Sequence, residues 1–558
     1  MEKRALLAVV LSLVILILYQ EWMTRYYPAP PPPQETEREE KKPESAAPPA
    51  PKPEPALQAA RLPAPAKPQA IKEIKIETDD YVALFTSQGA RLKSFKLKHY
   101  RAAFDEKSPP FEMVPSVPGV PYPFGVEIPE ATPLKDEELA YSAQGGDLQL
   151  TGNNQGRLLF RAESPTGAVL TKEFTFTGSG YAIGMQVSVE KGPARPIEVI
   201  LTSVARPNGP NANAPIGGGA VCSLLKFLFV PKTDAPFEGL LADVGGKLIR
   251  EHGDALKGKE WIGKVSWSSF GHTYFLFALL PEDNAEQKIT VRETGPAVVM
   301  KVGPQAAGGG TSKATHTIFI GPKELDVLKS MNRGLEGSID FGWFRPVSMP
   351  LLYVLHFFHR VTASWGMDII LLTILIKLLL APLTHKSFVS MKEMQKLQPQ
   401  MERLKEKYKD NKEALNKEIM ELYRRNKVNP FGGCLPMLLQ FPVFIGLYNA
   451  LLTPIELRHA PFLWIKDLSR PDWESLPVSV FGCHAGIPVL TLLMGASMFA
   501  QQWMTPTAGD PNQRRMMLMM PIIFTFMFIN FPSGLTIYWL VNNLLSIAQQ
   551  YVINRMKN

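Results

Sequence analysis

Three cysteines, Cys222, Cys434 and Cys483, are all that the 558-residue chain contains. None belongs to a CxxC pair or to a cluster with metal-ligand spacing, which argues against a metal centre built on cysteine. A disulfide between Cys222 and Cys483 requires both residues to lie outside the cytoplasm. The cysteines therefore predict no cofactor, and they leave that one pairing open.

A phosphate-binding loop is missing as well. The nearest match is GDALKGKE, which has Glu260 where Ser or Thr must hold magnesium. His356 and His359 are spaced like two ligands on one helix face, but no third ligand is nearby. We therefore expect neither a nucleotide nor a metal, and we interpret the two histidines as residues of a membrane interface.

The net charge of +8 has two interpretations. In a soluble protein it favours nucleic acid as a partner, whereas in a membrane protein Lys and Arg collect in cytoplasmic loops. The first twenty-odd residues and about the last two hundred are strongly apolar, so the second interpretation is favoured. We expect a phospholipid membrane around the protein and no sequence-specific contact with nucleic acid.

The N-terminal part combines an apolar run with a long proline-rich stretch. Residues 1–27 begin with Lys3 and Arg4 and continue with apolar side chains. A small-x-small cleavage site does not follow, so an uncleaved signal anchor with a cytoplasmic N-terminus is favoured over a cleaved signal peptide. Residues 28–70 are dominated by Pro, Ala and charge, and they predict an extended linker.

From residue 71 to residue 322 the hydrophobic period changes to two. Segments such as VALFTSQGARLKSFKLK and LTKEFTFTG alternate apolar and polar side chains, and Gly, Pro and Asn punctuate them. Such alternation is typical of strands with one buried face. It predicts an antiparallel β-sandwich outside the cytoplasm, and no repeat is short enough for a propeller or a solenoid.

The connecting segment 323–365 mixes apolar, aromatic and basic residues. Its second half, about Phe344 to Val361, predicts an amphipathic helix that lies in the membrane interface. The alternative is a further transmembrane helix. Four side chains argue against that alternative: Arg345, His356, His359 and Arg360.

Five apolar segments follow, each close to the roughly 20 residues that a helix needs to cross a bilayer. Together with the anchor they predict six spans, five of which form an α-helical transmembrane bundle. The five segments are residues 366–383, 431–452, 487–504, 516–531 and 534–553. Between and after them lie residues 384–430, 454–486, 505–515 and 554–558.

Positive charge alternates between these loops. Residues 384–430 are crowded with Lys and Arg, whereas residues 454–486 contain only three such side chains. The positive-inside rule then places both termini in the cytoplasm, and it places residues 28–365 and the loop 454–486 in the periplasm.

The basic loop 384–430 has a periodicity of its own. Apolar residues recur every three or four positions in two stretches, which KYKDNKEA separates. The pattern predicts an antiparallel helical hairpin in the cytoplasm, with a kink at Pro399. Two interpretations have equal weight, a docking surface for a partner or an incoming chain and a solvated connector.

One lysine stands inside the apolar run DIILLTILIKLLLAPLT. Lys377 is flanked by Ile and Leu on both sides, and a lysine at the centre of a spanning helix costs roughly 2.5–3.5 kcal/mol. Snorkelling to the interface is one interpretation. The favoured one is that the ammonium faces a wet or paired site inside the bundle.

Polar side chains on several spans support a site of this kind. Thr373 lies one turn before Lys377 on the same helix face. Some of the polar groups are expected to serve only as hydrogen bonds between helices. No span contains a central Asp or Glu, which a proton- or sodium-coupled transporter normally needs. The pattern predicts a polar, positively charged cavity that lowers the cost of moving acidic peptide segments partway across the membrane. The candidate residues are Lys377, Thr373, Gln440, Gln502, Trp539 and Asn543.

Four segments carry a resemblance to a known family. NPFGGCLPMLLQFPVFIGLY, LRHAPFLWIKDLS and FPSGLTIYWLVNNLLSIAQQ are similar to the third span, the second periplasmic loop and the last span of the bacterial YidC insertase family. FTSQGARLKSFKLKHY is similar to the large periplasmic domain of its Gram-negative members. The resemblance implies an insertase and folding chaperone of the bacterial inner membrane, not an enzyme, with a periplasmic β-sandwich of the galactose-mutarotase-like type.

The resemblance also implies a mechanism and partners. Family members have a hydrophilic groove that is open to the cytoplasm and to lipid and closed on the periplasmic side, and Lys377 matches their intramembrane positive residue. Thr373, Gln502 and Trp539 would line the same groove. The implied partners are nascent membrane-protein substrates, the Sec translocon and the ribosome.

Two departures from the family pattern matter. Lys377 replaces the usual Arg, which keeps the charge but loses the planar, bidentate guanidinium. The tail after the last span is only about NRMKN, shorter than the basic tail that helps many relatives bind ribosomes. The hairpin within residues 384–430 is therefore the candidate ribosome contact.

Two rival functions belong to other classes. A channel or transporter for an anionic solute would use Lys377 and would give saturable flux. An enzyme or sugar-binding protein would depend on the β domain, roughly Ile71–Thr315, and not on Lys377. The sandwich sequence shows no catalytic constellation, so an insertase is favoured over both.

Overall fold

The computed structural model describes most of the chain from residue 71 onward, and residues 71–558 belong to one unit. The predicted anchor (1–27), the predicted linker (28–70) and Cys222 lie outside the described residues. The described ranges are 71–105, 107–128, 134–165, 167–190, 196–204, 237–252, 259–283, 285–294, 297–305, 313–409, 411–426, 428, 435–480, 483–504 and 511–556.

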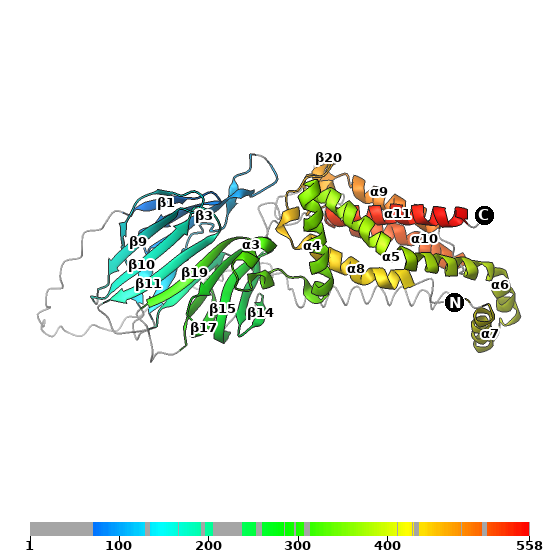
Figure 1. Cartoon of the computed structure of the whole chain (residues 1–558), viewed down its shortest axis with the longest axis horizontal. Coiled ribbons are helices and arrows are strands. Elements are labelled where there is room, and N and C mark those ends of the chain that lie inside the picture. Colours follow the sequence, from blue (N-terminus) through cyan, green and yellow to red (C-terminus); the bar gives the residue numbers. More distant parts are fainter. Residues whose placement is uncertain are drawn as a thin grey trace, which may run out of the picture. The chain divides into compact units, whose positions relative to one another are not determined.

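Strands form the part drawn from blue to green in Figure 1. They agree with the alternating sequence pattern, because residues in phase along a strand share one face of a sheet. The bounds are β1 Glu73–Glu77, β2 Tyr81–Thr86, β3 Arg91–Arg101, β4 Pro110–Glu112, β5 Gly125–Ile128, β6 Leu134–Lys135, β7 Ser142–Gln144, β8 Leu148–Gln149, β9 Gln155–Glu163, β10 Val169–Thr177, β11 Ala182–Glu190, β12 Glu198–Val204, β13 Phe237–Val244, β14 Lys247–Glu251, β15 Glu260–His272, β16 Phe275–Pro281, β17 Glu286–Thr294, β18 Ala297–Pro304 and β19 Lys313–Pro322.

Two sheets build the sandwich. The smaller sheet has the order β4-β3-β2-β1-β8, and the larger runs β6-β5-β12-β18-β17-β15-β16-β19-β11-β10-β9-β7, with β13 pairing β15 and β14 pairing β13. The predicted β-sandwich is thus confirmed. One described pair departs from the antiparallel prediction, because β1 and β8 run parallel.

Aromatic side chains join the two sheets. Along β10, Leu170, Lys172, Phe174 and Phe176 are buried, whereas Thr171, Glu173 and Thr175 are half-buried. Phe85 of β2, in the smaller sheet, has its ring centroid 4.8 Å from that of Phe174 and 5.6 Å from that of Phe176. The sheets therefore pack face to face over the alternating residues that the sequence pattern marked as apolar.

The buried face of β10 also carries a cation. The Lys172 ammonium donates to the carbonyl oxygens of Gly89 at 2.7 Å and Phe124 at 2.8 Å, and to the Asp136 carboxylate. Asp136, 1% exposed, also accepts from Arg91 Nη2 at 2.6 Å. Burial lowers the pKa of Lys172 to about 8, and Asp136 acts in the opposite direction. Three acceptors meet the three N–H donors, and the charge has a buried counterion.

Helices dominate the chain after the sandwich, as predicted, and are drawn from green to red in Figure 1. A short hairpin of β20 Pro477–Val480 and β21 Cys483–Gly486 interrupts them. The helix bounds are α3 Leu325–Ser330, α4 Arg345–Thr362, α5 Trp365–Lys396, α6 Gln398–Lys407, α7 Lys412–Arg425, α8 Leu435–Leu452, α9 Val489–Met504, α10 Pro511–Phe528 and α11 Ser533–Met556.

Helix α4 covers the segment expected to lie in the membrane interface. Leu352 and Leu355 are buried on one face, whereas Phe357 is 62% and Val361 81% exposed. The helix ends at Ala363, whose positive φ of 51° breaks the helical path and lets α5 start two residues later. An apolar surface is thus left open along a helix that packs on α5 and α8 with its other face.

Helix α5 is longer than the predicted span 366–383. It continues without a break to Lys396, because Thr384 to Lys396 contains no helix-terminating residue. The break comes at Leu397, and Pro399 occupies the first turn of α6, where a missing N–H costs little. The following helices α6 and α7 pack together, with the Tyr423 hydroxyl 3.1 Å from Met401 Sδ.

Among the described residues, one helix, α5, is long and apolar enough to cross a membrane. Two shorter apolar helical stretches, Gln440–Leu452 and Met517–Phe528, lie below that length. The six predicted spans and the cytoplasmic position of the α6–α7 pair stay predictions.

Candidate functional site

Helix α11 carries polar side chains to several neighbours. It contacts α5, α8 and α9, and a polar side chain on each of these helices forms a hydrogen bond with it. Interhelical hydrogen bonds of this kind satisfy polar groups that would otherwise lie in an apolar environment. We call the line of contacts between α5 and α11 the polar seam, and it includes Lys377, Thr384, Ser546 and Gln549.

Lys377 forms one of the two side-chain contacts of this seam. Its Nζ donates to Ser546 Oγ at 2.7 Å, and the Ser546 hydroxyl in turn donates to the Asn542 carbonyl oxygen at 2.8 Å. Ser546 is 4% exposed, so the bond is formed inside the bundle. Among the residues that the structure describes, no carboxylate lies within 4.0 Å of the ammonium and its other N–H groups have no acceptor. The site is a half-buried cation held by one hydroxyl.

A second polar contact of the seam lies closer to the C-terminal end of α5. Gln549 Nε2 donates to Thr384 Oγ1 at 2.9 Å, while the Thr384 hydroxyl donates to carbonyl oxygens of its own helix. Lys377 and Thr384 are seven residues apart, two turns of one helix face. The seam is therefore polar at two levels on the same side of α5.

Thr373, one turn before Lys377, makes its hydrogen bond within its own helix, and its predicted place in the groove stays a prediction. It is 1% exposed, and its hydroxyl donates to the Ile369 carbonyl oxygen at 2.6 Å. The side chain is satisfied within its own helix. Its hydroxyl is therefore buried and bonded within α5.

Two of the predicted residues join helices to one another. Asn543 Nδ2 donates to Ser497 Oγ of α9 at 3.0 Å, and Gln440 Nε2 of α8 donates to the Tyr538 hydroxyl at 3.4 Å. Asn543 is 3% exposed. Both amides fit the interpretation as bonds between helices.

Trp539 packs among aromatic rings of other helices, and Gln502 lies on α9. The Trp539 ring packs at centroid distances of 4.8 Å from Phe444 and 5.1 Å from Phe528, which places it in an aromatic cluster with α8 and α10. Gln502 is half-buried on α9 and has no hydrogen bond to another described residue. Of the six candidates, no two are joined by a direct side-chain bond.

The sequence prediction did not assign Ser546 to the site. Its signal was present, because Asn543, Ser546 and Gln550 recur at three and four on α11. Periodicity identifies the polar face of a helix, but it does not identify which residue on a neighbouring helix that face will meet.

The two histidines on α4 each meet a carboxylate. His359 Nδ1 lies 2.7 Å from Asp368 Oδ2, and His356 Nε2 lies 3.4 Å from Glu456 Oε1. Glu456 raises the pKa of His356 above its ordinary value. Over the described ranges, no group of three or more His, Cys, Asp or Glu residues is arranged to hold a metal ion.

Comparisons with known proteins cover both parts of the chain. Residues 73–354 match the family model of the YidC periplasmic domain, and residues 357–558 match that of the 60Kd inner membrane protein. Membrane protein insertase YidC of Pelobacter propionicus is 39% identical over 584 residues, which cover 100% of each chain. Its counterpart in Syntrophus aciditrophicus is 38% identical over 573 residues, again 100% of each chain.

A solved structure is similar over a large part of the chain. It is described as an active YidC insertase crystal structure with the first transmembrane domain resolved, is 20% identical, and matches 87% of this chain and 93% of its own with a TM-score of 0.37. The two family models and the full-length relatives establish the assignment without it. The chain belongs to the YidC family of inner-membrane protein insertases, whose members are insertases and not enzymes.

Proposed function

We propose that this insertase moves its substrates through a hydrophilic groove beside the polar seam, with the Lys377 ammonium as the group that attracts them. The observation that carries the proposal is the incomplete hydrogen bonding of Lys377, which has one described acceptor, Ser546 Oγ. A cation in an apolar bundle is costly unless it meets a polar group. An acidic segment of a nascent chain supplies the missing acceptors and the missing negative charge.

The six candidate residues divide into two roles. Lys377 and Gln502, both half-buried, are the side chains we assign to the groove surface. Thr373, Gln440, Trp539 and Asn543 hold the wall, because Thr373 is bonded within α5 and the other three contact neighbouring helices. The substrate enters as a polar segment, and its apolar part then moves into lipid, driven by about 25 cal/mol per Å² of buried apolar surface.

The topology belongs to the same proposal. Six spans, both termini in the cytoplasm and residues 28–365 in the periplasm account for the alternation of Lys and Arg between loops. In this arrangement α6 and α7 face the cytoplasm and form the contact for a ribosome, and the Sec translocon assists with some substrates. The sandwich is proposed to be of the galactose-mutarotase-like type and to carry no sugar chemistry. Protease accessibility in oriented vesicles tests the two sides directly.

Insertion into proteoliposomes tests the role of Lys377. The substrate has one span and an acidic N-terminal tail, and protection of that tail from protease reports insertion. Lys377→Ala is expected to lower insertion at least about tenfold, since a hydrogen bond to a charged group is worth about 1.5–3 kcal/mol. Lys377→Arg keeps most of the activity. Lys392→Ala, on the same helix beyond the seam, is the matched control and leaves insertion unchanged.

Two further measurements separate the proposal from its rivals. A channel or transporter gives saturable flux of an anionic solute through Lys377, whereas the proposed groove gives none in liposomes without substrate protein. A function located in the sandwich is lost when residues 71–315 are deleted. The proposal predicts that cells depending on this chain still grow after that deletion and fail to grow with Lys377→Ala.

A further inference from the structure

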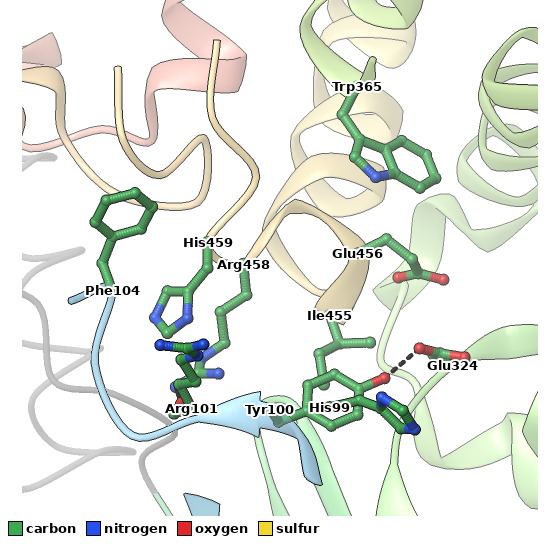
Figure 2. Close-up of a pocket in the computed structure, with 10 residues that line it drawn as sticks. All are labelled: His99, Tyr100, Arg101, Phe104, Glu324, Trp365, Ile455, Glu456, Arg458 and His459. Carbon is green, nitrogen blue, oxygen red and sulfur yellow. Dashed lines mark hydrogen bonds between the residues drawn. The ribbon is translucent and has the colours of Figure 1, made fainter. Parts of the chain in front are cut away.

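A cavity of about 580 Å³ lies where the end of β3 meets the start of α5 and the loop that follows α8 (Figure 2). We call it the junction pocket. Tyr100 and Arg101 come from β3, Trp365 is the first residue of α5, and Glu456 and Arg458 come from the loop. Its volume lies within the range of small-molecule sites in proteins, about 300–1,000 Å³.

Opposite charges line opposite sides of this pocket. Arg101, Arg458 and His459 gather on one side, and Glu324 and Glu456 on the other, as Figure 2 shows. A ligand that complements both sides of the pocket carries a negative and a positive group separated by a short linker.

The basic side is held in place by the surrounding structure. Arg458 is 8% exposed, its Nη2 donates to the Arg101 carbonyl oxygen at 2.8 Å, and its guanidinium lies 5.5 Å from the Phe111 ring and 5.6 Å from the Phe275 ring. Next to it, His459 has a positive φ of 60°, a strained conformation for a side chain of this size. Strained residues cluster at binding sites, and a fixed guanidinium forms strong hydrogen bonds with anions.

The acidic side has more acceptors than donors. Glu324 accepts a hydrogen bond from the Tyr100 hydroxyl, and Glu456 has His356 Nε2 3.4 Å from its Oε1. Glu456 Oε2 is buried and has no hydrogen-bond partner among the described residues. Burial raises the pKa of Glu324, and the nearby Glu456 acts in the same direction. A primary ammonium, with three N–H donors and a positive charge, satisfies this wall.

The pocket also lies near one end of a spanning helix. Trp365 begins α5, the helix that is long and apolar enough to cross a membrane. Tryptophan is enriched where a span meets lipid headgroups. Val361 and Met367, within four residues of Trp365, are 81% and 42% exposed and give apolar surface beside the headgroup level.

We propose that the junction pocket binds a phosphoethanolamine headgroup. The phosphate contacts Arg101 and Arg458, and the primary ammonium lies between Glu324 and Glu456. Bound there, the headgroup would tie the end of the sandwich to the start of α5. The inference concerns a site other than the groove and does not depend on it.

Lipid retention by the full chain tests the proposal. The purified protein in detergent receives an equimolar mixture of phosphatidylethanolamine, phosphatidylglycerol and phosphatidylcholine with identical acyl chains, and native mass spectrometry counts the lipids that stay bound. Phosphatidylethanolamine is expected to be retained about fivefold over both others, because only it combines the phosphate with N–H donors. Soluble glycerophosphoethanolamine, added as a competitor, distinguishes a free headgroup from a membrane lipid as the source.

Variants on both sides of the pocket sharpen the test. Glu456→Gln and Arg101→Gln are each expected to remove most of the preference for phosphatidylethanolamine. Arg161→Gln and Glu190→Gln change an exposed pair on the sandwich outside the pocket and are expected to keep it. Equal retention of the three lipids, a preference for phosphatidylglycerol, or a preference unchanged in both pocket variants overturns the proposal. Arg101 has an exposed side chain, so its variant stays informative if Glu456→Gln folds poorly.

Discussion

Two lysines lie inside apolar parts of this molecule, Lys172 in the sandwich and Lys377 in the helical bundle. Lys172 has three acceptors and the buried carboxylate of Asp136 as counterion. Lys377 has one described acceptor, the Ser546 hydroxyl. The fold therefore provides acceptors for all three N–H donors of Lys172 and for only one described donor of Lys377.

The difference separates structural from functional charge. A buried ion pair with all its hydrogen bonds made has no unused donor or acceptor to offer a ligand. An incompletely bonded cation reduces stability, and its presence is explained by what it binds. On this account Lys172 serves the fold and Lys377 serves the substrate.

Removing the counterion of Lys172 gives the largest expected effect. Asp136→Ala leaves Lys172 and Arg91 buried without their shared carboxylate, so the free energy of unfolding of the sandwich is expected to fall by about 3–5 kcal/mol. Thermal unfolding of the full chain, followed by the circular dichroism of the strands, measures the loss. Glu137→Ala is the matched control, because Glu137 is 46% exposed and lies 3.7 Å from Arg91. Equal losses in the two variants would show that Asp136 does not hold the cluster.

Replacing each lysine by methionine tests the comparison from both ends. Lys172→Met leaves Asp136 and two carbonyl oxygens short of a donor, so the unfolding free energy is expected to fall by about 2–3 kcal/mol. Lys377→Met removes an incompletely bonded cation and is expected to raise stability by about 1 kcal/mol while insertion falls. Thermal midpoints in one detergent measure both. A loss of stability in both variants would make Lys377 a structural residue.

Removing the one described acceptor of Lys377 gives a smaller effect. Ser546→Ala frees the ammonium to move, so insertion of an acidic-tailed substrate is expected to fall about threefold, less than with Lys377→Ala. Ser497→Ala, which removes the acceptor of Asn543 on another helix pair, is the control and is expected to change insertion less. The proteoliposome assay measures both variants. A loss in Ser546→Ala as large as that in Lys377→Ala would assign the main role to the hydroxyl.

The smallest expected effect concerns the ion pair between His356 and Glu456, a residue of the junction pocket. Glu456 raises the pKa of His356, and Glu324 and Asp326 act in the same direction. The pair's stability is therefore present below about pH 6.5, the ordinary pKa of histidine, and is lost as the pH rises through the raised folded value. We expect about 0.5 kcal/mol, because the pair is partly exposed to solvent. Thermal midpoints of the wild type and His356→Gln should differ more at pH 6 than at pH 8, and the opposite trend would contradict this sign.

The sequence allowed much of the sandwich to be predicted. In LTKEFTFT, Lys172 is in phase with Leu170, Phe174 and Phe176, so its burial was readable from the alternation. Its counterion was not, because Asp136 is 36 residues away, in a short helical turn after β6, and reaches Lys172 only through tertiary packing. Alternation identifies a face, and tertiary structure decides what meets that face.

The helical part was predictable in a similar way. Hydropathy found the span that contains Lys377, but it placed the end of that segment at residue 383, whereas α5 continues to Lys396. Hydropathy follows the apolar thickness of a membrane, and a helix ends only where its backbone is broken. The polar face of α11 was also visible in the sequence, while the bond from Lys377 to Ser546 depends on how α5 and α11 cross.

The central claim is that the charge of Lys377 attracts the charge of the substrate. The most direct measurement is insertion into proteoliposomes of two single-span substrates, identical except for an acidic or a basic N-terminal tail, by wild type and Lys377→Glu. The account predicts that Lys377→Glu lowers insertion of the acidic tail at least about tenfold and raises insertion of the basic tail, because one charge reversal compensates the other. Equal insertion of the acidic tail by both proteins would contradict it.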